Sequence, residues 1–128
     1  MSKSAVSTTN APAPVSGAPY NQAIVSGGFV FVAGQVPLDP ATGALAEGGI
    51  EAQTEQVFDN LAAILEAAGS SLANVVKATV FLADMASFAA VNGVYARRMP
   101  EPFPARSAFA VRELPLGAEV EIEVIAHV

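Results

Sequence analysis

Two short apolar runs near the start of the chain are separated by a glycine pair. Residues 23–26 and 29–33 are rich in β-branched and aromatic side chains, and Gly27 and Gly28 lie between them. Two glycines between strand-like runs are typical of a β-hairpin, because glycine readily adopts the positive φ angles of a tight turn. This stretch predicts two antiparallel strands.

The spacing of apolar residues changes after the loop sequence PLDPATGAL. Residues 50–69 carry apolar side chains at intervals of three and four, which is the period of one face of an α-helix. The residues on this face are Val57, Leu61, Ile64, Leu65 and Ala68. Gly69 follows the last of them and suits the left-handed position that ends many helices. A helix is therefore predicted over residues 50–69.

The second half of the chain predicts a strand, a helix and two further strands. Residues 74–84 are apolar and β-branched, as in a buried strand, and Asp84 is placed to cap a second helix that ends before Pro100. Apolar residues on one side of this helix are Met85, Phe88, Val91 and Tyr95. Residues 105–128 read as two strands around a loop that contains Pro115 and Gly117.

This order of elements predicts an α+β fold, with one mixed sheet that two helices cover on one face. Residues 1–14, rich in Ser, Thr, Ala and Pro, are expected to be a flexible lead-in, and residues 15–128 a single domain. The other face of the sheet needs a cover, which a neighbouring subunit can supply.

The composition supports an oligomer and argues against some partners. Hydrophobic residues make up 52% of the chain and charged residues only 14%, which leaves little polar material for the surface of a monomer. The net charge is -6, and the only adjacent cations are Arg97 and Arg98. Nucleic acid is therefore not an expected ligand, whereas a small anion remains compatible.

Metal sites and membrane segments are also not expected. The chain has no cysteine, and its only histidine, His127, is next to the C-terminus. We therefore do not expect a metal site. No apolar run reaches the roughly 18 residues of a membrane span, and the N-terminus lacks the apolar stretch of a signal peptide. A cytoplasmic protein is the expectation.

One arginine stands in an otherwise small and apolar strand, FPARSAFAV. Strand alternation places Arg106 on the same face as Ala108 and Ala110, which predicts open volume beside the guanidinium. Its planar fork of N–H donors suits a carboxylate. An internal ion pair and a position at a sheet edge are the structural alternatives.

The last strand offers two carboxylates. Glu121 and Glu123 share one face of EVEIEVIA. Either is a candidate partner for Arg106 or a general base that acts on water, and a solvated strand face is the plain alternative.

Two further polar residues lie among apolar neighbours. Asn92, in the second helix, is a candidate to bridge to a strand or to line a pocket. Tyr20, after Pro19, is a candidate to present its phenol to a ligand or simply to pack.

Several of these segments together resemble the RidA (YjgF) family of enamine and imine deaminases. The matching motifs are APVSGAPYNQAI, AGQVPLDPATG, FPARSAFAV and LPLGAEVEIEVIA, together with the long segment from QTEQVFDNLAA to FAAVNGVY. They occur in the family's order from about Ala11 to Ala126, nearly the whole chain.

The resemblance implies a homotrimer with a chorismate-mutase-like fold and ligand sites between subunits. It implies cofactor-independent hydrolysis of 2-imino acids, which form from enamines such as 2-aminoacrylate, to 2-keto acids and ammonia. By motif, it assigns carboxylate binding to Arg106 and the positioning of water to Glu121. Carried over in the same way, Tyr20 is a third catalytic residue, and Gly34, Asn92 and Ala108 are further substrate contacts.

The chain departs from the family pattern at three positions that bear on substrate preference. Ala33 stands where the family often has serine, Ala18 where it often has glycine, and Ala108 where some members have cysteine. The alternative function is a non-catalytic trimer that senses a small carboxylate in the same cleft. Some members have also been labelled ribonucleases, which the acidic charge and the single histidine argue against here.

Overall fold

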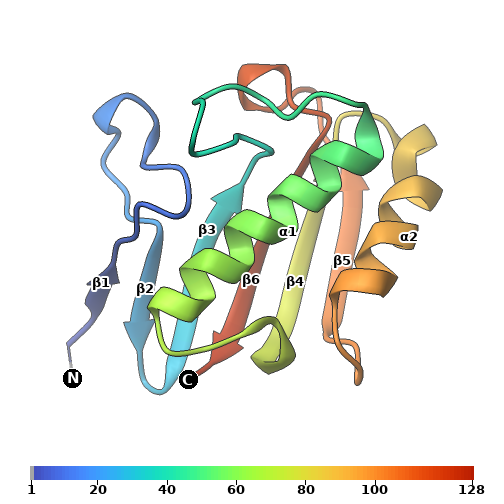
Figure 1. The fold of residues 1–128 in the computed structure, drawn as a ribbon. Coiled ribbons are helices and arrows are strands. Elements are labelled where there is room, and N and C mark those ends of the chain that lie inside the picture. Colours follow the sequence, from blue (N-terminus) through green and yellow to red (C-terminus); the bar gives the residue numbers. More distant parts are fainter. Residues whose placement is uncertain (1) are drawn as a thin grey trace.

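A single mixed sheet forms the body of the protein. The computed structural model describes residues 2–128, and its six strands are ordered β1-β2-β3-β6-β4-β5. The strands are β1 Ser4–Val6, β2 Ala23–Ser26, β3 Phe29–Gln35, β4 Val75–Leu82, β5 Ala105–Ala110 and β6 Val120–His127. Two α-helices, α1 Ile50–Ala67 and α2 Phe88–Arg98, lie side by side on the same face of the sheet (Figure 1). This confirms the predicted α+β class.

The strand pairing explains why the sheet is mixed. Strands β4 and β5 are parallel, while the pairs β1–β2, β2–β3, β3–β6 and β4–β6 are antiparallel. A parallel pair needs a long crossover, and α2 provides it. Strand β5 is therefore an edge strand whose inner face lies under α2, a placement that matters for Arg106.

The predicted hairpin is confirmed, and its second strand is longer than expected. Gly27 and Gly28 have φ angles of 61° and 84°, as a two-residue turn with two left-handed positions requires. Strand β3 continues to Gln35, with an irregularity in its pairing with β6 between Val32 and Gln35.

Helix α1 follows the predicted pattern. Its apolar face is fully buried at Val57, Leu61, Ile64 and Leu65. Gly69 has a φ of 80°, and the next N–H, of Ser70, donates to the carbonyl of Leu65 at 2.8 Å. This is the left-handed helix ending that Gly69 predicts.

The start of the second helix differs from the prediction. Asp84 accepts a hydrogen bond from the N–H of Ala86 at 2.9 Å, but the turn it caps is the short 3-10 segment Met85–Ser87, and α2 begins at Phe88. Met85 is 45% exposed, so its predicted place on the buried side is wrong. The tighter turn takes Met85 off the helical period, whereas Val91 and Tyr95 are buried as expected.

The N-terminal segment differs as well. We expected a flexible lead-in over residues 1–14, and the structure places Ser4–Val6 in the sheet as β1, paired with β2. The following loop is held by the buried side chain of Gln22. Its Oε1 accepts from the N–H of Thr8 at 2.7 Å, and its Nε2 donates to the carbonyls of Ala11 and Pro12 at 3.2 and 2.8 Å. The loop contributes backbone groups to these hydrogen bonds, so its amino-acid composition could not predict them.

The sheet face opposite the helices is strongly apolar. In β3, Val30 and Val32 point into the core, and Phe29 and Phe31 point away from it and are 41% and 44% exposed. On the same face, Phe109 of β5 is 47% exposed and packs edge-to-face against Phe81 of β4, with ring centroids 5.4 Å apart. No helix in residues 2–128 is both long and apolar enough to cross a membrane.

Candidate functional site

Arg106 lies beneath α2, on the helix-covered face of the edge strand β5. Its Nη1 donates a hydrogen bond of 2.8 Å to Oδ1 of Asn92. Its Cζ is 4.7 Å from the ring centroid of Tyr95 and 5.6 Å from that of Phe88. Asn92 therefore bridges from the helix to the strand, which is one of the two roles predicted for it, and it orients the guanidinium.

The surroundings of Arg106 differ from the expected alanine-lined space. Ala108 shares its strand face and packs partly buried against the core, but the walls beside the guanidinium are residues of α2. The spacing of Phe88, Asn92 and Tyr95 is four and then three residues, which puts all three on one face of the helix. The apolar pattern of the helix predicted that the two aromatic residues pack, without linking them to Arg106. Their spacing from Asn92 is the signal that could have linked them.

Arg106 has no carboxylate partner in the structure. The ion pairs among residues 2–128 join Arg97 and Arg98 to Glu55 and Asp59, and none includes Arg106. A half-buried guanidinium with unused N–H donors is suited to bind an external anion.

Glu121 lies on the other face of the sheet. It pairs with Phe81 in the β4–β6 ladder, and its buried neighbours Val120 and Ile122 point to the helices. The prediction that Glu121 or Glu123 pairs with Arg106 is therefore wrong within one chain. Partial burial, followed by the nearby charge of Glu123, raises the pKa of Glu121 above its usual 4.5. Both effects disfavour the ionised carboxylate, which makes it a stronger base once it is ionised.

Gly34 is adjacent to the Glu121 carboxylate. A Cβ at position 34 would be 2.9 Å from Cδ of Glu121 and would collide with Oε2. A side chain at position 34 would therefore displace the Glu121 carboxylate from the position that it has in this structure.

Tyr20 also lies near Gly34, since both residues line one small pocket with Val15 and Gln35. Its phenol oxygen accepts a hydrogen bond from the N–H of Val15 at 3.0 Å, and the residue is 44% exposed. The hydroxyl thus closes the 15–20 turn and can still present its own proton to a ligand.

The predicted site residues form two groups that a single chain does not bring together. The first group contains Tyr20, Gly34 and Glu121, and the second contains Asn92, Arg106 and Ala108. Arg106 and Glu121 project from opposite faces of the sheet, so a single chain keeps the two groups apart. We call them the Glu121 half-site and the Arg106 half-site. Within residues 2–128, no cluster of three or more His, Cys, Asp or Glu side chains is arranged to hold a metal ion.

Comparison with known proteins identifies the family. The model of the family described as Endoribonuclease L-PSP matches residues 8–128. The chain belongs to this family. It is the RidA (YjgF) family that the motifs resemble, and the predicted membership is confirmed.

Individual family members are similar over nearly the whole chain. A RutC family protein of Pyrococcus horikoshii is 51% identical over 98% of both chains. A 2-iminobutanoate/2-iminopropanoate deaminase of Capra hircus is 46% identical, over 94% of this chain and 87% of its own. The crystal structure of RidA from the Antarctic bacterium Psychrobacter superposes with a TM-score of 0.92 at 46% identity, covering 98% of this chain and 99% of that one.

Proposed function

We propose that this protein is an enamine and imine deaminase, which hydrolyses 2-imino acids to 2-keto acids and ammonia. The observation that carries the proposal is the guanidinium of Arg106, which is held by Asn92 and has no carboxylate partner within residues 2–128. The 46% sequence identity to the 2-iminobutanoate/2-iminopropanoate deaminase of Capra hircus supports the same reaction.

Arg106 binds the carboxylate of the substrate. One of its nitrogens already donates to Asn92, and the remaining N–H groups are available for a pair of hydrogen bonds to two carboxylate oxygens. Fixing the carboxylate also fixes the adjacent C=N group, so the reacting carbon is presented in one orientation. Ala108, on the same strand face, leaves room beside the bound acid.

Glu121 positions water and takes its proton. A protonated imine is already electrophilic, so the attack needs only modest help. Water adds its oxygen to the C=N carbon and gives a proton to Glu121, and that proton then passes to the nitrogen. The new hydroxyl group then gives its proton to Glu121 as the C–N bond breaks, ammonia leaves, and a 2-keto acid remains. Tyr20 donates a hydrogen bond to the departing nitrogen or to the water, and Gly34 lets the Glu121 carboxylate lie close to the strand.

The complete site forms between subunits of a homotrimer. Since Arg106 and Glu121 project from opposite sheet faces, the Glu121 half-site of one chain must meet the Arg106 half-site of another. The exposed phenylalanines of the uncovered face supply an apolar surface for this contact. The partners we propose are thus two further copies of the chain and a small imino or keto acid.

The chemistry needs no metal or organic cofactor, because the substrate carries its own electrophile. We also propose a cytoplasmic location.

The proposal is tested by ammonia release from freshly generated 2-aminoacrylate. Purified protein should speed ammonia release well above the rate in buffer, and activity should survive treatment with a chelator. Arg106→Ala should remove the acceleration. Tight binding of 2-oxobutanoate without any acceleration would instead show the alternative function, a carboxylate sensor.

A further inference from the structure

The aromatic rings beside Arg106 have no role in the reaction described above. Tyr95 is nearly fully buried, with 6% of its surface exposed, and its ring centroid lies only 4.7 Å from the guanidinium carbon. Phe88, about two turns earlier on the same helix face, is 5.6 Å away. Together with Asn92, these residues surround the guanidinium from α2.

We propose that Tyr95, assisted by Phe88, is a positioning residue that holds the Arg106 guanidinium ready for the substrate carboxylate. This inference rests on the proposed carboxylate-binding role of Arg106. Tyr95 acts through Arg106 and takes no part in the chemical step.

The ring of Tyr95 is itself fixed by the core. It packs edge-to-face against Phe58 of α1, with centroids 5.7 Å apart and an interplanar angle of 77°. A rigid ring attracts a cation through its negative π face and removes conformations that a long side chain would otherwise sample. With Asn92 fixing one nitrogen, the guanidinium is oriented before the ligand arrives, which lowers the entropic cost of binding.

The contribution comes from the ring and not from the hydroxyl. The Tyr95 oxygen is buried and has no hydrogen-bond partner within residues 2–128. Burial raises the pKa of this phenol, and the nearby charge of Arg106 offsets this only in part, so the hydroxyl stays protonated. A phenylalanine at this position would keep the ring and should therefore keep the function.

The decisive measurement is the affinity for 2-oxobutanoate, followed by titration calorimetry on the intact protein. Tyr95→Leu should weaken binding by about 2- to 30-fold, the range of a cation–π contact from exposed to desolvated settings. Tyr95→Phe should bind as the wild type does. In turnover, Tyr95→Leu should raise KM and leave kcat close to the wild-type value, because the contact is made equally with bound substrate and transition state.

A matched control separates positioning from a general loss of stability. Val94, next to Tyr95 on α2, is fully buried in the core. It is not one of the residues that contact the Arg106 guanidinium, which are Phe88, Asn92 and Tyr95. Val94→Ala should lower the unfolding temperature but leave 2-oxobutanoate affinity unchanged. Equal loss of affinity in Val94→Ala and Tyr95→Leu would overturn the proposal.

A measurement on the wild type does not depend on any variant folding. The Nε–H proton of Arg106, observed by NMR, should be shifted upfield by the ring current of Tyr95 and should exchange slowly with water. An Nε–H signal at the position of a free arginine would overturn the proposal.

The two proposals fail in different ways. If the wild type binds 2-oxobutanoate with the predicted pattern of variants but releases no ammonia from imines, the deaminase proposal fails and the positioning role stands. If the wild type is an active deaminase and Tyr95→Leu is unchanged in affinity and KM, the positioning role fails alone.

Discussion

At the scale of single residues, Arg106 and Glu121 are charged groups in positions that lower the stability of the fold and leave both groups free to bind a ligand. Arg106 is partly buried with a hydrogen bond to neutral Asn92 and no counter-charge within residues 2–128. Glu121 is a carboxylate whose ionised form is disfavoured by burial and by Glu123. Selection for stability alone would pair or replace such groups. Unpaired charged groups of this kind are therefore often found where a protein binds a charged substrate.

Removing the Arg106 guanidinium should abolish ligand binding and spare the fold. Arg106→Ala should weaken 2-oxobutanoate binding at least tenfold, since a charged hydrogen bond contributes on the order of 1.5–3 kcal/mol. No carboxylate is stranded by the change, so the melting temperature should fall only modestly. Calorimetry and thermal unfolding measure the two effects.

Arg106→Lys tests geometry apart from charge. It keeps the positive charge but replaces a planar fork with a single ammonium on a flexible stem, so it should recover only part of the affinity. Complete recovery would show that charge alone suffices. A fully active Arg106→Ala would contradict the assigned role.

Glu121→Gln should slow imine hydrolysis while leaving keto-acid binding nearly intact. Loss of a general base typically costs about 10²–10⁴-fold, and a reactive imine should place the effect toward the lower end. Glu123→Gln is the control, because it shares the strand face without contacting Gly34. Equal rates in the wild type and Glu121→Gln would assign Glu121 to structure.

The same residue makes a prediction about pH. Because the folded-state pKa of Glu121 is raised, kcat/KM should fall at a pH above the ordinary 4.5 as the medium is acidified. Glu123→Gln removes one of the two causes and should move this acid limb to lower pH. The raised pKa also means that ionisation of Glu121 disfavours the fold, so Glu121→Gln should be more stable than the wild type at neutral pH. That difference should vanish below 4.5, where the carboxyl is protonated in both the folded and the unfolded states.

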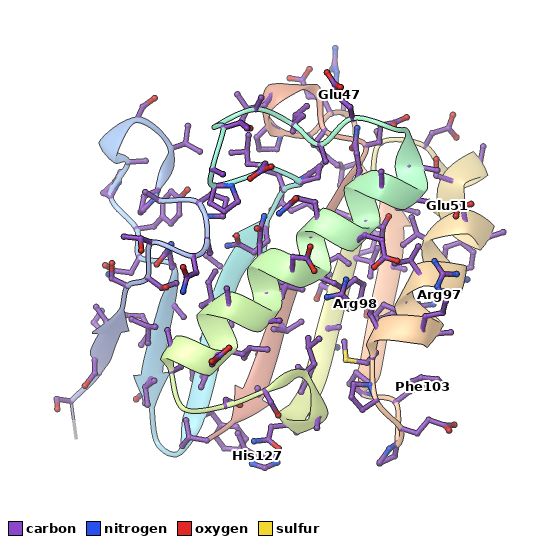
Figure 2. The ribbon with its side chains drawn as sticks, viewed as in Figure 1. Glu47, Glu51, Arg97, Arg98, Phe103 and His127 are labelled. Atoms are coloured by element: carbon purple, nitrogen blue, oxygen red, sulfur yellow. The ribbon has the colours of Figure 1, made fainter. Side chains whose placement is uncertain are left out.

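At the scale of elements, the contact between α1 and α2 supports the helix that carries Asn92. Arg98 pairs with Glu55 at 2.7 Å and with Asp59 at 2.8 Å, and Arg97 reaches Glu55 at 3.4 Å. Figure 2 shows Arg97 and Arg98 projecting from α2 beside α1. These pairs hold the two helices in register over the sheet.

Glu55→Gln should destabilise the protein by about 0.2–1 kcal/mol at neutral pH, the usual contribution of a solvent-accessible pair. The hydrogen bond from Arg98 is the main reason that the pKa of Glu55 is lowered from 4.5. Its stabilising contribution is therefore present above 4.5 and is lost as the pH falls through the lower folded-state value. Urea unfolding of both proteins at neutral and acidic pH checks this. A gap that widens on acidification would contradict the ion-pair explanation.

The turn before β6 contains a conformation that leucine disfavours. Leu116 has a φ of 61° and Gly117 one of 73°, and the N–H of Ala118 donates to the carbonyl of Pro115 at 3.1 Å. A left-handed non-glycine residue costs roughly 1–2 kcal/mol, and asparagine tolerates the position better. Because Leu116 is 56% exposed, Leu116→Asn should lose little burial and raise the melting temperature.

Leu114→Asn is the matched control. Leu114 has an ordinary φ of -116° and is only partly exposed, so the same exchange should lower the melting temperature. A loss of stability in both variants would show that the left-handed position of Leu116 carries no appreciable strain.

At the scale of the whole molecule, the uncovered sheet face and the split site lead to the same expectation. The protein should form a trimer, which light scattering after gel filtration would detect as about three times the 13.0 kDa chain mass. Phe109→Glu should dissociate it, because a charge would replace an apolar side chain that is 47% exposed on this face. The dissociated protein should lose deaminase activity, since each chain keeps only its half-sites.

Met85→Glu is the control for the trimer. Met85 is similarly exposed, at 45%, but it lies in the turn before α2 and not on the sheet face. This variant should remain trimeric and active. A monomeric wild type with full activity would contradict both the assembly and the shared site.

Local patterns in the sequence were sufficient for most elements. The hairpin around Gly27 and Gly28, the helix ending at Gly69 and the strand face of Arg106 all depend on neighbours within a few residues. Side-chain periodicity and glycine's backbone freedom report on such neighbours directly. The family motifs added the expected reaction and the roles proposed for the candidate site residues, which no local pattern could supply.

Only the tertiary structure decided which of these residues meet. Strand β1 joins the sheet through backbone hydrogen bonds, which leave no side-chain signature in residues 4–6. The strand order puts β6 between β3 and β4, and that order, together with strand alternation, turns Glu121 away from α2 while Arg106 lies beneath it. The rings of Phe88 and Tyr95 reach Arg106 because the crossover from β4 to β5 lays α2 over the edge strand. Contacts of this kind join residues distant in the chain, and their geometry follows from the packing of whole elements.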